Sequence, residues 1–199
     1  MTSSTTLTSR PEASFTPHLR LSTVLAGAIL IAFCSVIEIP LRPVPVTGQT
    51  FGVLYVAALL GPVQGTCAVL LYLTAGLAGL PVFSGGSFGV YQLFGPTGGY
   101  LVGFIAAAAV VGSLSGRNTV GRRLPVAVAM LLGTLVIYAF GVLRLSSFIG
   151  FERSITLGVL PFLPGDLFKL ILASLLLPDT RITLPDGVSG AFDNGRVLR

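Results

Sequence analysis

Two charged side chains interrupt the last apolar segment of the chain. Asp166 and Lys169 lie in the stretch Gly165-Asp-Leu-Phe-Lys169, and a separation of three residues places both on one face of a helix. Charged groups inside a membrane span are costly and usually face the protein interior or a wet cavity. We therefore expect this pair to bind a polar ligand. The alternative is a structural pair at the start of a helix, where the helix dipole favours Asp166.

A third charged candidate, Arg42, lies in a proline-rich segment, Pro40-Leu-Arg-Pro-Val-Pro45. Prolines restrict the backbone to extended conformations, and a stiff segment can aim a guanidinium at a carboxylate. The alternative is an arginine whose head group reaches the membrane interface. Neutral hydrogen bonds or aromatic walls for the same ligand could come from Thr47, Gln49, Tyr91 and Tyr100.

Composition predicts the environment that must hold these residues. The chain has 199 residues, of which 53% are hydrophobic and 10% charged, whereas soluble domains contain about 25% charged residues. Residues 43–116 contain no charge at all. A membrane-spanning helix needs about 20 apolar residues, so this tract must cross a bilayer several times. We expect an all-α integral membrane protein in contact with lipid.

Glycines, prolines and arginines divide the apolar sequence into six expected transmembrane helices in a compact bundle. The second and third helices meet at Gly61-Pro62, and a small-residue pattern, Gly95, Gly99 and Gly103, lets the fourth pack closely against a neighbour. The six helices form one domain, 20–178, between a disordered amino-terminal segment, 1–19, and a carboxyl-terminal tail, 179–199. Their expected ranges are 20–38, 50–61, 63–78, 97–114, 124–143 and 161–178.

Arginines predict the orientation of the bundle. With both termini in the cytoplasm, eight arginines lie on the cytoplasmic side and three outside, in agreement with the positive-inside rule for a multi-pass protein of the inner (plasma) membrane. The segments 39–49, 79–96 and 144–160 then share the outer side. Irregular backbone at membrane depth is tolerated where it is buried or lines a cavity, which predicts an outward-facing ligand cavity. The alternative is a set of ordinary connecting loops.

Several function classes lack their sequence signatures. The chain has no phosphate-binding loop of the kind used by ATPases, no zinc-type ligand spacing around Cys34 and Cys67, and no nucleophile motif of a hydrolase. Its basic residues flank apolar segments instead of forming a stripe for nucleic acid. We expect a binding protein or carrier that is not an enzyme and that holds no metal or cofactor of its own.

Taken together, several motifs resemble the BioY family, the biotin-specific substrate-binding subunits of energy-coupling factor (ECF) transporters. The resemblance runs from about residue 20 to 178. The motifs are Pro43-Val-Pro-Val-Thr-Gly-Gln-Thr50, Leu60-Gly-Pro62, Gly79-Leu-Pro-Val-Phe83, Gly95-Pro-Thr-Gly-Gly-Tyr100 and Leu160-Pro-Phe-Leu-Pro-Gly-Asp-Leu-Phe-Lys169.

The resemblance implies high-affinity capture of biotin on the outer side and coupling to a transmembrane scaffold subunit with two ATPases, which would use the ATP. It also implies that Asp166 and Lys169 line the biotin pocket, and that Ala28 and Ala32 contact the scaffold. Some relatives carry an asparagine after the Pro-Val-Phe motif, where this chain has Ser84-Gly-Gly86, so Ser84 or backbone amides are the expected replacement.

The loop 79–100 is then expected to form a lid in which aromatic side chains exclude water: Phe83, Phe88, Tyr91 and Phe94. Two other functions remain open from the sequence. One is a binding subunit or solitary transporter for a different vitamin or cofactor precursor. The other is an intramembrane enzyme or structural scaffold in which Asp166 is an acid, a base or a packing group.

Overall fold

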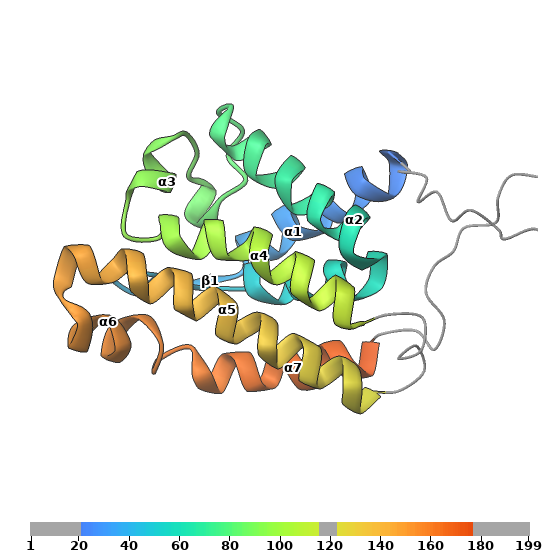
Figure 1. Ribbon diagram of the computed structural model, residues 1–199. Helices are drawn as coiled ribbons and strands as arrows, with labels where there is room; N and C mark the ends of the chain where they lie inside the picture. Colours follow the sequence, from blue (N-terminus) through green and yellow to red (C-terminus); the bar gives the residue numbers. More distant parts are fainter. Residues whose placement is uncertain (1–20, 116–122, 177–199) are drawn as a thin grey trace, which may run out of the picture.

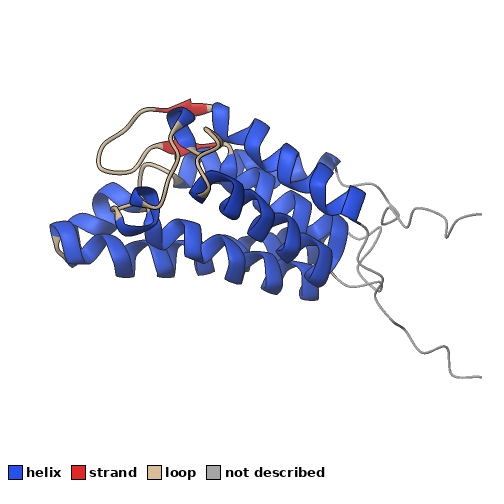
Figure 2. Ribbon diagram, turned by 90° about the horizontal axis from the view of Figure 1, so that it is seen from above, coloured by secondary structure: helices blue, strands red, loops and turns tan. Residues whose placement is uncertain are grey.

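The computed structural model describes residues 21–115 and 123–176, and these residues are mostly helical. The long helices run lengthwise beside one another, with the strands, α3 and α6 at one end of the bundle and the first described residues at the other (Figures 1 and 2). In chain order the elements are α1 (Leu21–Val36), β1 (Glu38–Ile39), β2 (Val46–Thr47), α2 (Gln49–Leu77), the 3-10 turn η1 (Ser84–Gly86), α3 (Tyr91–Phe94), α4 (Gly98–Leu114), α5 (Arg123–Ile149), α6 (Phe151–Gly158) and α7 (Leu163–Leu176).

Helix α2 folds back on itself at Gly61. The backbone there has φ 84° and ψ −176°, a conformation that only glycine adopts readily, and Pro62 follows. Gln49 and Tyr72 would lie about 35 Å apart along a straight helix, but their side chains are hydrogen bonded at 2.6 Å. The expected break at Gly61-Pro62 is therefore confirmed. Helix α2 consists of two arms, 49–60 and 62–77, that pack against each other.

With α2 counted as two arms, helices lie at all six expected positions, but the sequence missed several features. The fifth helix continues to Ile149, six residues beyond the predicted end, and the expected loop 144–160 contains the amphipathic helix α6. The proline-rich segment closes with a short antiparallel pair, Glu38 with Thr47 and Ile39 with Val46, so the fold is not strictly all-α. The predicted terminal segments, 1–19 and 179–199, lie outside the described residues.

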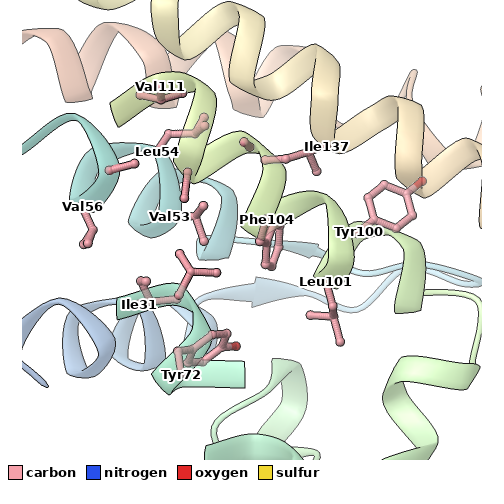
Figure 3. Close-up of a cluster of buried hydrophobic side chains, with 14 of the residues drawn as sticks. Ile31, Val53, Leu54, Val56, Tyr72, Tyr100, Leu101, Phe104, Val111 and Ile137 are labelled. Carbon is pink, nitrogen blue, oxygen red and sulfur yellow. The ribbon is translucent and has the colours of Figure 1, made fainter. Parts of the chain in front are cut away.

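Close helix packing depends on the small residues of α4. A Cβ atom at Gly99 would lie 2.3 Å from the carbonyl oxygen of Phe140, and one at Gly103 would lie 3.0 Å from Cα of Ile137. The predicted close approach of the fourth helix is thus confirmed, with α5 as its neighbour. Buried side chains from α1, α2, α4 and α5 form one core (Figure 3). Fully buried members include Ile31, Val53 and Ile137.

Large apolar side chains also cover the outside of the bundle. Phe33 is 69% exposed, Leu143 73% and Phe168 67%, and other exposed leucines, isoleucines and phenylalanines extend along the same helices. Soluble proteins rarely expose contiguous apolar surface of this extent, whereas lipid solvates it. The exterior therefore fits a multi-pass membrane protein.

Length and composition identify two helices that could each cross a membrane, α2 and the part of α5 from Pro125 to Ile149. The bent pair α6 and α7 would make a third span, and α1 and α4 are shorter apolar helices. Because α2 is a hairpin, its total length is not the length of one span.

We expect Gly61→Ala to destabilise the protein, because an L-residue in this backbone conformation costs about 1–3 kcal/mol. Thermal unfolding of the full chain in detergent measures the effect. Gly95→Ala is the matched control, because a Cβ there meets nothing closer than 3.4 Å and φ is negative. An equal melting temperature for Gly61→Ala and the wild type would contradict the assigned turn.

Candidate ligand-binding site

A cavity of about 510 Å³ lies among the loops at the end of the bundle that carries β1, β2 and α3. This volume is typical of sites that enclose a small organic ligand. The cavity brings together segments that are far apart in sequence. Seven of the predicted ligand-binding residues line it: Arg42, Thr47, Gln49, Phe83, Ser84, Tyr91 and Tyr100.

The proline-rich segment forms one wall of the cavity. The β1–β2 pair ties its two ends together, so that Arg42 lies at the tip of a short closed loop. Arg42 is exposed and is the single charged residue that lines the cavity among the described residues. Within this part of the chain its guanidinium has neither a hydrogen bond nor an ion pair, so it is available to an anionic ligand group.

A chain of polar contacts fixes the loop that faces this wall. The Gln49 side-chain amide donates to the Tyr72 hydroxyl at 2.6 Å, and Tyr72 donates to the carbonyl oxygen of Val82 at 3.1 Å. Ser35 also donates to the Val82 carbonyl, at 2.6 Å. Three helical segments therefore hold the backbone just before Phe83.

The loop itself covers the cavity less completely than the sequence predicts. Phe83 is buried, with its ring packed edge-on against Tyr72. Tyr91, although it lines the cavity, is 79% exposed, and Phe88 and Phe94 are exposed as well. Only Phe83 is buried in this structure, whereas the rings of Phe88, Tyr91 and Phe94 lie exposed, so an aromatic lid over a bound ligand stays a prediction.

A hydrogen bond to Glu38, on β1, fixes the side chain of Ser84. Its hydroxyl donates to the Glu38 carboxylate, which also lies against the backbone of Gly85. The hydroxyl hydrogen is therefore occupied, and Ser84 presents acceptor capacity to the cavity.

Asp166, which is buried, and Lys169, which is partly buried, do not line the large cavity but form an ion pair directly behind it. Lys169 Nζ lies 2.8 Å from Asp166 Oδ1, and it also donates to the Thr47 carbonyl oxygen at 2.7 Å and the Thr50 hydroxyl at 2.9 Å. All three ammonium hydrogens are thereby used. The predicted pairing on one helix face is confirmed, whereas the predicted direct lining of the ligand site is not seen.

Tyr138 and Thr50 separate this pair from the cavity, and the sequence analysis missed both. Tyr138 donates to Asp166 Oδ2 at 2.5 Å and Thr50 donates to Oδ1 at 3.3 Å, while both residues line the cavity. Phe162, also missed, packs its ring against Tyr138 and Tyr100. The one sequence signal was that a buried aspartate needs donors, and tyrosines and threonines of neighbouring spans are its natural source.

The two alanines of the expected partner face occupy different environments. Ala28 is 7% exposed and belongs to the core, so its methyl group packs inside the chain. The assignment of Ala28 to a partner surface stays a prediction, and in this structure the residue faces the core of its own chain. Ala32 is only partly buried. No cluster of three or more metal-ligating side chains occurs in the residues described.

Comparison with known proteins gives consistent matches. The model of the BioY family matches residues 7–186. A probable biotin transporter BioY of Pyrococcus horikoshii is 38% identical over 152 residues, which cover 75% of this chain and 90% of that protein. The biotin transporter BioY of Thermotoga maritima is 42% identical over 149 residues, covering 74% of this chain and 86% of the relative.

A solved structure matches the fold. The crystal structure of the S-component for biotin from an ECF-type ABC transporter superposes with a TM-score of 0.73 at 29% sequence identity. The match covers 79% of this chain and 87% of that one.

We expect Lys169→Met to lower the free energy of unfolding by about 3–5 kcal/mol, because it leaves the buried Asp166 carboxylate without its counter-charge. The double variant Asp166→Asn, Lys169→Met removes both charges and should recover much of that loss. Thermal unfolding in detergent measures both variants, with Arg153→Met on the exposed face of α6 as the matched control. Equal losses in the single and double variants would contradict a stabilising charge pair.

Proposed function

This chain belongs to the BioY family, and we propose that it is the biotin-binding membrane subunit of an ECF transporter. It captures biotin on the outer face of the membrane and delivers it inward together with an ATP-driven module. The supporting observation is the cavity of about 510 Å³, which has aromatic walls and, at its rim, a guanidinium with no ion pair to any residue that the structure describes. Relatives named as biotin transporters, each covered over most of its length, support the choice of ligand.

The lining of the cavity fits the chemistry of biotin. Arg42 can pair with the valerate carboxylate, while Phe83, Tyr100 and Phe104 provide apolar surface for the thiophane ring and the alkyl chain. The ureido group has two N–H donors and one carbonyl acceptor. Hydroxyl and amide groups of Thr47, Gln49 and the floor of the cavity can satisfy them.

The subunit works as a binding protein and not as an enzyme in this proposal. ATP is hydrolysed by two partner ATPases, which act through a transmembrane scaffold subunit. Six helical rods, with α2 contributing two, cross the inner membrane, and both termini face the cytoplasm. The loop end of the bundle, which carries the cavity, then faces outward.

A second candidate is the capture of a different vitamin or cofactor precursor. It is favoured by one observation: Ser84, which stands where some relatives carry an asparagine, already donates its hydroxyl to Glu38. Titration of the purified chain with biotin and with other vitamins distinguishes the two candidates.

We expect the purified chain to bind biotin tightly and with near 1:1 stoichiometry, and to show no binding of thiamine or riboflavin. Calorimetric titration in detergent measures this, with desthiobiotin as a close analogue. Preferential binding of another vitamin by a folded sample would move the function to the second candidate.

We further expect Arg42→Met to weaken biotin binding about tenfold, since a charge-assisted hydrogen bond contributes about 1.5–3 kcal/mol and exposure reduces it. Biotin methyl ester, which lacks the carboxylate charge, should lose little affinity in the same variant. Arg153→Met on α6 is the matched control. If acid and ester lose affinity equally, Arg42 does not bind the carboxylate.

The contact with the scaffold is tested at Ala32, the partly buried alanine of α1. Ala32→Trp should reduce co-purification with the scaffold subunit and leave biotin binding unchanged. The large indole ring would prevent a scaffold helix from packing closely against α1. Ala139→Trp, on an exposed position of α5, is the matched control. Normal co-purification of Ala32→Trp would place the scaffold contact elsewhere.

A further inference from the structure

Helix α6 rests on the rest of the bundle through a narrow strip of small residues. Of its eight residues, Ser154 and Gly158 are buried, and a separation of four places both on one side of the helix. The hydroxyl of Tyr100, a residue of the cavity lining, donates to the Gly158 carbonyl oxygen at 2.8 Å. A Cβ atom at Gly158 would lie 2.4 Å from that hydroxyl. This close contact fixes which sides of α6 stay uncovered.

The uncovered sides of α6 differ in polarity. Phe151 and Ile155, also four residues apart, form an apolar side next to the buried strip, and they are 65% and 38% exposed. Glu152, Arg153 and Thr156 are exposed on the opposite side, where the two charges cancel. An apolar side beside a polar back is the pattern of helices that lie in the plane of a membrane interface.

The apolar side of α6 continues the apolar exterior of the bundle. The helix packs against α5 at the loop end of the bundle (Figure 1). Just before α6, Leu143 is 73% exposed and Phe148 49%, and just after it Leu160 is 52% exposed and Leu163 47%. Leu157 adds exposed apolar surface on the other flank of α6. Lipid solvates such a surface, and α6 lies within its run along the chain.

The length of α5 sets the depth at which α6 lies. The apolar part of α5 runs for 25 residues, from Pro125 to Ile149. At about 1.5 Å per residue it measures about 37 Å, more than the hydrocarbon core of about 30 Å. A span of this length, centred in the bilayer, ends in the headgroup layer on each side. Gly150, with φ 82°, then turns the chain directly into α6.

We propose that α6 docks onto a phospholipid surface: Phe151 and Ile155 insert below the headgroups, while Glu152, Arg153 and Thr156 face water. The driving force is the removal of apolar surface from water. Because α6 carries no net charge, docking does not depend on anionic lipid. The surface is that of the outer leaflet, a detail that rests on the orientation proposed above.

The test uses the absence of tryptophan from the chain, since a single introduced indole reports only its own surroundings. Phe151→Trp places the indole on the apolar side, and Thr156→Trp, on the polar back of the same helix, is the matched control. Each full-length variant is placed in nanodiscs of phosphatidylcholine brominated near the glycerol end of its acyl chains. We expect bromine to quench most of the fluorescence of Phe151→Trp and little of that of Thr156→Trp. Replacing half of the lipid with phosphatidylglycerol should change neither value.

Equal quenching of the two variants would overturn the proposal. So would a blue-shifted emission of Phe151→Trp that bromine does not quench, because a protein surface such as a second copy of the chain would then cover α6. Stronger quenching of Phe151→Trp by bromine at the ends of the acyl chains would also contradict it, since α6 would then lie in the hydrocarbon core.

Thermal unfolding like that of the wild type verifies that each variant is folded. Ile155→Trp, on the same side of α6, takes the place of Phe151→Trp if that variant does not fold, and the same outcomes then apply. The measurement uses no biotin. A failure of lipid docking is therefore distinguishable from a failure of the proposed function, which the biotin titration reveals.

Discussion

The ion pair between Lys169 and Asp166 joins parts of the bundle that are far apart in the chain. Lys169 bonds to the Thr47 carbonyl and the Thr50 hydroxyl at the start of α2, and Asp166 accepts from Tyr138 of α5. In an apolar surrounding an unpaired charge is far more costly than in water, so this network permits essentially one relative placement of α2, α5 and α7. Because Thr50 and Tyr138 also line the cavity, that placement shapes the floor of the site.

The walls above this floor are irregular backbone held by side-chain hydrogen bonds. The Gln49–Tyr72–Val82 contacts and the β1–β2 pair fasten two loops whose own sequences are mainly glycine, proline and small polar residues. Each loop inserts one apolar side chain, Val44 or Phe83, into the helical core, so both loops depend on the helices for position. A rigid helical floor with loops attached at defined points allows the rim to adapt to a ligand while the floor remains fixed.

The sequence predicted the helices well, because apolar tracts broken by glycine, proline and arginine leave few alternatives. Gly61-Pro62 marks a turn that the structure confirms. The β1–β2 pair and α6 were missed because each is short and depends on tertiary contacts. In the site, seven lining residues were predicted from their loops, but Tyr138 was not, because a lone tyrosine in an apolar span reveals nothing of a partner 28 residues away. Ala28 lies in the core, which the sequence did not reveal, because a small-residue spacing does not say which way its face points.

In the proposed carrier, different parts of the site attract the ligand and distinguish it from other molecules. The exposed guanidinium of Arg42 can attract an anion from solution, since charge acts over a longer distance than hydrogen bonding. The floor is neutral as a unit, and every hydrogen of its lysine is already bonded within the protein. Departure of the ligand therefore leaves no unpaired charge in the buried floor, and the Arg42 guanidinium that it uncovers is exposed to solvent. Such a site can hold its ligand through directional hydrogen bonds and still release it, and a carrier requires release as much as capture.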